Sequence, residues 1–201
     1  MIVQDDYEIK LKKKSIQSFE KYHKDSLFNL KYEKIIKLND GSPVGLRSLT
    51  RNDFNKLFAF FELLSKETIF YRHFSQNPNI KFIEAKRILS ALNRNELIII
   101  AEDLNDEEIP FLGIIELIKS QEELGSGELA VIVADKWHGK HLGQQMIEYM
   151  ILLAKLNGFK KIFGYYLINN YKIHSLIQKL GHKCEKSRDL DIIEIIYNLD
   201  N

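Results

Sequence analysis

The stretch from Gly127 to Met150 reads GELAVIVADKWHGKHLGQQMIEYM, and it decides the fold. Its first half is a short apolar run opened by Glu128, which is the pattern of a strand buried on both faces. From Leu142 onward the apolar residues recur at helical spacing, so we expect a helix to begin near His141. The sequence therefore predicts a buried strand, a short joint and a helix in direct succession.

The joint between these two elements reads His138-Gly139-Lys140-His141-Leu142-Gly143. The first amides of a helix have no partners within the helix and carry the positive end of its dipole, which suits a phosphate. Gly139 and Gly143 would let an anion approach the backbone, and Lys140 adds a positive charge beside it. A diphosphate is the expected ligand. Because the joint is neither a Walker loop nor a Gly-x-Gly-x-x-Gly turn, ATP and NAD are not expected.

The same six residues resemble the acetyl-CoA-binding motif of the GNAT superfamily of N-acetyltransferases, written Gln/Arg-x-x-Gly-x-Gly/Ala. Two positions depart from that motif, because His138 stands at the Gln/Arg position and His141 at the first motif glycine. A side chain at position 141 would crowd a pyrophosphate if the position needs the torsions of glycine, whereas a helix-start conformation would tolerate it.

The flanking segments extend the resemblance in the order of elements that the family has. Residues 40–53 and 64–74 resemble the opening strand and a following run of the acetyltransferase domains of bacterial protein lysine acetyltransferases. Asn170 begins a helical stretch that closes on residues 179–182, Lys-Leu-Gly-His, similar to the family's Asn-to-Leu-Gly-Phe segment. The resemblance covers roughly residues 40–199, and the order of elements is more specific than any one motif.

The resemblance implies the GNAT fold, which is of mixed α/β class, with a mostly antiparallel sheet of six to seven strands that is splayed in the middle and flanked by helices. The hydrophobic patterns agree with that fold. They predict strands over residues 34–38, 43–49, 97–101, 110–118, 128–134, 161–168 and 192–198, and helices over 53–64, 65–74, 80–92, 141–156 and 170–180. We expect residues 1–37 to form an N-terminal helical extension and residues 38–201 to form the acetyltransferase domain.

The composition narrows the class of protein. With 29 Lys and Arg against 28 Asp and Glu in 201 residues, the net charge gives no reason to expect nucleic acid or a membrane as a partner. The single cysteine, Cys184, excludes an internal disulfide and a multi-cysteine metal site, and fits a reducing cytoplasm. No apolar stretch is long enough to span a bilayer, so we expect a soluble, cytoplasmic protein. The oligomeric state is left open.

For the cofactor, the resemblance implies acetyl-CoA. Backbone groups of the central strand would hold the pantetheine arm, with the amide of Val133 as the leading oxyanion donor. Asn170 matches a family asparagine that contacts the cofactor, and it also suits a helix N-cap. The predicted cofactor-binding residues are Val131, Ile132, Val133, Gly139, Lys140, His141, Leu142, Gly143, Gln144 and Asn170.

The acceptor amine needs a group that removes its proton. Glu128 is the candidate general base, because partial burial at the start of an apolar strand would favour proton uptake at neutral pH. Glu116, on the preceding strand, is the rival base, and an ordinary structural carboxylate is the competing interpretation of Glu128.

Many family members carry a tyrosine as general acid seven residues after the asparagine, but this chain has Ile177 there. Solvent, Tyr165, Tyr166 or His174 could protonate the leaving thiolate instead. Tyr71, Arg72 and His73 are candidates to line the acceptor cleft, because in the family the two helices over residues 53–74 flank that cleft.

Two functions therefore remain. One is an acetyl-CoA-dependent N-acetyltransferase acting on a primary amine, with a protein lysine, a polyamine or another small amine as acceptor. The other is a catalytically silent acyl-CoA-binding module, which His141 and the missing tyrosine favour.

Overall fold

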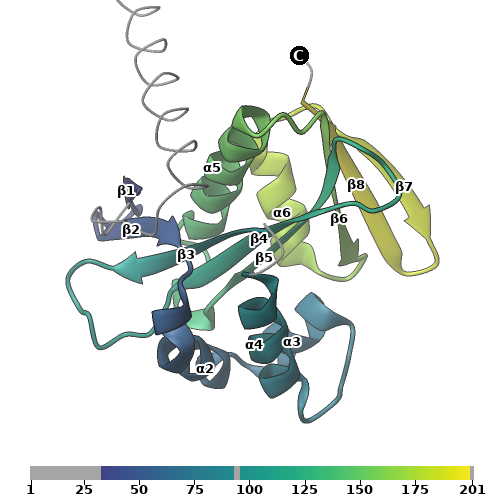
Figure 1. Ribbon diagram of the computed structural model, residues 1–201. Helices are drawn as coiled ribbons and strands as arrows, with labels where there is room; N and C mark the ends of the chain where they lie inside the picture. The colour runs from purple at the N-terminus through teal and green to yellow at the C-terminus, as the bar shows by residue number, and fades with distance from the viewer. Residues whose placement is uncertain (1–32, 93–95, 200–201) are drawn as a thin grey trace, which may run out of the picture.

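The structure is a computed structural model that describes residues 33–92 and 96–199. Most of the predicted N-terminal extension lies outside these residues. The described chain forms a mixed sheet in the order β1-β2-β3-β4-β5-β6-β8-β7 (Figure 1). The strands are β1 (Lys34–Lys37), β2 (Pro43–Ser48), β3 (Leu97–Asp103), β4 (Gly113–Lys119), β5 (Ser126–Val133), β6 (Lys161–Leu167), β7 (Glu185–Asp189) and β8 (Ile192–Asn198).

Helices cover both faces of this sheet (Figure 1). One face carries α5 and α6, which pack against each other, and the other carries α2, α3 and α4. The helices are α2 (Phe54–Leu63), α3 (Lys66–His73), α4 (Ile80–Ala91), α5 (Leu142–Leu156) and α6 (Tyr171–Leu180), and short 3-10 turns occupy η1 (Arg51–Asp53) and η2 (Asp135–Trp137).

The central strands are buried because they are sandwiched between these helix layers. The side chains of Ile99, Ile100, Ile114 and Ile115 are at most 1% exposed. A continuous apolar run is the pattern of such a strand, which explains why β3 and β4 could be predicted from the sequence. The run in β5 predicted a strand buried on both faces, but residues 128–131 and 133 are only half-buried because they line a cavity.

The predicted fold class is confirmed, and one strand was missed. The sheet has eight strands among the described residues, and the additional one is β7, which pairs antiparallel with β8. All five side chains of β7 are exposed. It therefore has no buried face and no apolar alternation by which a sequence could reveal it. At the other end, β1 pairs with β2 from Lys34, so the sheet begins before the predicted domain boundary at residue 38.

The predicted splay in the middle of the sheet is present between β5 and β6. These strands are the only parallel pair in the described sheet, and they pair only over Ser126–Glu128 against Lys161–Phe163. Beyond that point the strands diverge. A Cβ on Gly164 would lie 2.9 Å from the carbonyl oxygen of Leu129, so glycine permits the close approach at the vertex of the gap.

Within residues 33–92 and 96–199 no helix is long and apolar enough to cross a membrane, and no cluster of three or more metal-ligating side chains is found.

Candidate active site

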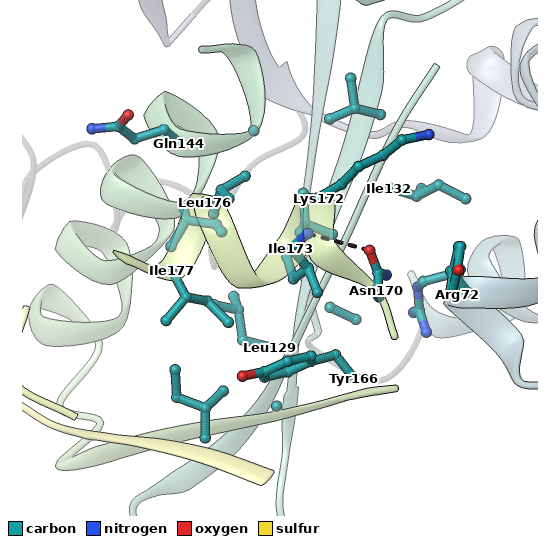
Figure 2. Close-up of a pocket in the computed structure, with 18 of the residues that line it drawn as sticks. Arg72, Leu129, Ile132, Gln144, Tyr166, Asn170, Lys172, Ile173, Leu176 and Ile177 are labelled. Atoms are coloured by element: carbon teal, nitrogen blue, oxygen red, sulfur yellow. Dashed lines mark hydrogen bonds between the residues drawn. The ribbon is translucent and has the colours of Figure 1, made fainter. Parts of the chain in front are cut away.

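A cavity of about 600 Å³ opens where β5 and β6 diverge (Figure 2). Residues 128–133 of β5 form one wall and residues 162–166 of β6 the other. The joint before α5, most of α6, part of α3 and two residues of β8 also contribute to the lining. The cavity therefore brings together the segments that the sequence singled out separately.

The backbone of β5 presents hydrogen-bonding groups to this cavity. The amide of Ala134 donates to the carbonyl of Leu112 at 2.9 Å, so Ala134 and alternate residues before it direct their backbone groups toward β4. Val131 and Val133 lie between them in the alternation and direct theirs toward β6, which has already diverged. These are the groups expected to hold a pantetheine arm.

Ile132 differs from its neighbours. It lies two residues before Ala134, whose amide donates to Leu112 of the β4 side, so its backbone groups face β4 rather than the gap. Its side chain still lines the cavity. The backbone contribution predicted for three residues thus falls to Val131 and Val133.

His138 fixes the end of this strand. Its Nε2 lies 2.8 Å from the carbonyl oxygen of Val133, and because a carbonyl only accepts, Nε2 is the donor. The residue at the motif's Gln/Arg position therefore satisfies an orphan backbone acceptor of β5.

The joint ends in an open helix N-terminus. The first intrahelical bond of α5 runs from the amide of Gln145 to the carbonyl of His141 at 3.1 Å. The amides of Leu142, Gly143 and Gln144 precede it and have no partner within the helix. They border the cavity, which is the arrangement expected of an anion site.

His141 does not have the helix-start conformation that would tolerate a side chain without cost. Its φ is +68°, in the left-handed region, as is that of Gly139 at +76°. A non-glycine residue pays about 1 kcal/mol there, although histidine enters this region more readily than most residues. The motif position does need the torsions of glycine, and this chain adopts them with histidine.

The two motif glycines have different roles. A Cβ on Gly139 would meet no atom within 4 Å, so this glycine leaves open space beside the joint. A Cβ on Gly143 would lie 2.9 Å from Cδ1 of Leu176 on α6. Gly143 is therefore required for the packing of α5 on α6, a reason that the sequence did not reveal.

Lys140 is turned away from the cavity. Its Nζ lies 2.9 Å from Oδ2 of Asp40, in the turn between β1 and β2, and 4.5 Å from the centre of the Trp137 ring. Trp137 itself is 7% exposed and packs beneath the joint. The positive charge predicted beside the phosphate is thus paired with the carboxylate of Asp40.

The two candidate bases lie on one face of the sheet but in different surroundings. Glu128 is half-buried and lines the cavity at the vertex where β5 and β6 meet. Glu116 is 2% exposed and its carboxylate is held by Arg72 at 3.2 Å and by Arg87 at 2.6 Å. Glu116 does not line the cavity. Of these two carboxylates, Glu128 is the one that lines the cavity.

Helix α3 forms the wall opposite, and Asp135 fixes its start. The Asp135 carboxylate accepts from the Ser65 amide at 3.0 Å, the Ser65 hydroxyl at 2.7 Å and the Thr68 hydroxyl at 2.8 Å. Burial would raise the pKa of Asp135, but these hydrogen bonds outweigh it and hold the pKa at about 2. This contact could not be predicted from the sequence, because no local pattern links an acidic residue at the end of a strand to a helix about 70 positions earlier in the chain.

Of the three residues expected to line the acceptor cleft, two do. Tyr71 and Arg72 line the cavity, and the Tyr71 hydroxyl lies 3.4 Å from the carbonyl of Asn169. His73 instead points into the protein, where its Nδ1 is 3.8 Å from Glu84. Burial, with the nearby Arg72 charge, lowers the pKa of His73 to about 4. His73 is a structural residue.

Helix α6 covers the gap from the other face of the sheet. Asn170 caps it, because its Oδ1 accepts from the amide of Ile173 at 3.2 Å, and Asn170 also lines the cavity (Figure 2). Ile177 lines the cavity where the family has its tyrosine. Tyr165 and Tyr166 also line the cavity. Tyr166 is 3% exposed, and its hydroxyl lies 3.4 Å from Nδ1 of His174.

Comparison with known proteins agrees with this geometry. The family model described as acetyltransferase (GNAT) domain matches residues 44–183, which is more than half of the chain. The chain therefore belongs to the GNAT acetyltransferase family.

Particular relatives support the same assignment. The chain is similar to the acetyltransferase PA5475 of Pseudomonas aeruginosa, with 25% identity over 162 residues that cover 81% of this chain and 86% of the relative.

Two solved structures show the shared fold. The GNAT domain of S. lividans PAT has a TM-score of 0.73 at 18% identity, covering 86% of this chain and 99% of that one. A spermidine N-acetyltransferase from Vibrio cholerae, solved in complex with CoA and spermine, has a TM-score of 0.62 at 18% identity, covering 78% and 95%.

Proposed function

We propose that this chain is an acetyl-CoA-dependent N-acetyltransferase that moves an acetyl group to a primary amine, either a protein lysine or a small amine, in the cytoplasm. The observation that supports this most strongly is the continuity of the cavity. It runs from the open N-terminus of α5, through the gap between β5 and β6, to the carboxylate of Glu128.

The residues of the cavity fit coenzyme A. The amides of residues 142–144 would receive the diphosphate, with the space beside Gly139 leaving the backbone accessible. The backbone groups of Val131 would hold the pantetheine arm, whose amides can take the place of the missing strand partner. The carbonyl of Val133 already accepts from His138, which leaves its amide for the thioester end of the cofactor. When bound, acetyl-CoA supplies an acetyl group activated as a thioester.

The chain's own groups then act on the acceptor. Glu128 would take the proton of the amine, directly or through water, as the amine attacks the thioester carbon. The C–S bond would then break, and coenzyme A would leave as a thiolate that solvent protonates. The amide of Val133, which points into the gap, would donate to the thioester oxygen as that oxygen gains charge. The wall made by α3 would hold the acceptor on the Glu128 side, since Thr68, Tyr71 and Arg72 line the same cavity.

The direct test combines binding and turnover. Calorimetry should show binding of acetyl-CoA, and release of free thiol should follow when an amine panel is added. Glu128→Gln should lower kcat at least tenfold and leave the acetyl-CoA dissociation constant within about twofold. Failure to bind acetyl-CoA would refute the proposal.

A silent acyl-CoA-binding module is the second candidate, and Ile177 in place of the family tyrosine is the observation that favours it. It would be established if acetyl-CoA binds, no amine is acetylated and Glu128→Gln changes neither property.

A further inference from the structure

The wall that α3 contributes to the cavity is connected to a network of charged, hydrogen-bonded side chains. Arg72 lines the cavity and donates to Oε1 of Glu116 at 3.2 Å. The other oxygen of Glu116 accepts from Arg87 at 2.6 Å, and Arg87 also donates to Glu84 at 2.8 Å. The carboxylates of Glu116 and Glu84 are 3% and 8% exposed, so most of this network of charged side chains is buried behind the wall.

Among the four residues of this charged network, Arg72 is the one that lines the cavity (Figure 2). A guanidinium has five N–H donors, and within residues 33–92 and 96–199 the hydrogen bond found for Arg72 engages one of them. Glu116 is shared with Arg87, so it does not saturate Arg72. The remaining donors are available to a planar acceptor such as a carboxylate, which guanidinium binds through two parallel hydrogen bonds.

The position of Arg72 relative to Glu128 follows from the register of the sheet. Glu116 is directly opposite Ala130, which is two residues along β5 from Glu128 on the same face. Two residues of strand span about 7 Å. The cationic end of the α3 wall therefore lies a short distance along the cavity from the carboxylate of the candidate base.

A cavity lined by both a carboxylate and an arginine is complementary to a molecule that carries the opposite charges. We propose that the acceptor is a small zwitterion, an amine that also bears a carboxylate, with its amine at Glu128 and its carboxylate on Arg72. This inference rests on the proposed function. It disfavours polyamines, because their second ammonium would face the guanidinium of Arg72.

The test compares amino acids with the amines that remain after their carboxylate is removed: lysine with cadaverine, ornithine with putrescine, and phenylalanine with phenethylamine. In at least one pair the wild-type protein should favour the amino acid by about ten- to hundredfold in kcat/KM, the value of one charged hydrogen-bonded contact. This comparison needs no variant, so it does not depend on how well a variant folds.

Arg72→Gln should then abolish that preference, because kcat/KM should fall at least tenfold more for the amino acid than for the matching amine, while the affinity for acetyl-CoA stays within about threefold. Lys81→Gln is the matched control, because it removes one positive charge on α4, paired with Glu62 away from the cavity, and should leave the preference intact.

Equal use of both members in every pair, or an equal loss for both members in Arg72→Gln, would overturn the zwitterion inference and leave the acetyltransferase proposal standing. Transfer to no amine at all, with acetyl-CoA bound, would overturn both.

Discussion

Glu116→Gln tests whether Glu116 is a structural residue and not the base. The substitution keeps the shape of the side chain and removes a charge that is 2% exposed and bound by two arginines. Breaking a buried ion pair on one side costs about 3–5 kcal/mol. We expect the lower end, about 3 kcal/mol, because Arg87 keeps its bonds to Glu84 and the two arginine side chains are 19% and 31% exposed.

For a chain of this size a loss of 3 kcal/mol lowers the melting temperature by roughly 6–12 °C. The assay is urea unfolding followed by the fluorescence of Trp137, the single tryptophan, which is 7% exposed in the folded protein. Glu128→Gln is the matched control. It changes a half-buried carboxylate at the cavity wall, so the free energy of unfolding should stay within about 0.5 kcal/mol of wild type.

We expect the two variants to differ in which property they lose: Glu116→Gln should lose stability, and Glu128→Gln should lose turnover. A Glu116→Gln protein of native stability that has lost turnover would show that Glu116 is the base and that the reasoning is wrong.

Three further predictions follow from single residues. His141→Gly should raise the free energy of unfolding by about 0.5–1 kcal/mol in urea, because it relieves the left-handed strain at φ +68°, and any loss of stability would contradict this. Asp135→Ala should lower the free energy of unfolding by about 1–3 kcal/mol, because three hydrogen bonds that fix the start of α3 are lost. It should also raise the KM of the acceptor more than that of acetyl-CoA. An unchanged acceptor KM would count against the role given to α3. The pKa of His73 is lowered to about 4 in the folded protein, so the unfolded chain binds a proton first as the pH falls below about 6.5. The free energy of unfolding should therefore decrease between pH 6.5 and 4. His73→Gln should flatten that decrease when unfolding is measured across this range.

The elements with a strong pattern could be predicted from the sequence, and the missed features have none. The continuous apolar run of β5 and the helical spacing from Leu142 gave the centre of the fold. By contrast β7 has no buried side chain, so periodicity carries no information about it. The need for Gly143 arises from Leu176, which is 33 positions later in the chain and on another helix.

The candidate site shows the same division. Residues joined by a local motif, from His138 to Gln144, could be placed around one cavity before any coordinates, although the turning of Lys140 toward Asp40 could not. The choice between Glu128 and Glu116 needed the pairing of β4 with α3 and α4, because both residues read as single carboxylates in apolar strands. The role of Arg72 likewise could not be predicted, because it depends on the sharing of Glu116 with Arg87, which leaves N–H donors of the Arg72 guanidinium for a ligand.

Amide hydrogen exchange with and without coenzyme A tests the central claim most directly. In the free protein the amides of Val131 and Val133 should exchange at least tenfold faster than that of Ile132, whose amide faces β4. Coenzyme A should slow the exchange at Val131 and Val133 and at residues 142–144, and leave Ile132 unchanged. Equal protection of all three β5 amides in the free protein, or binding that slows none of them, would contradict the claim that this gap holds the cofactor.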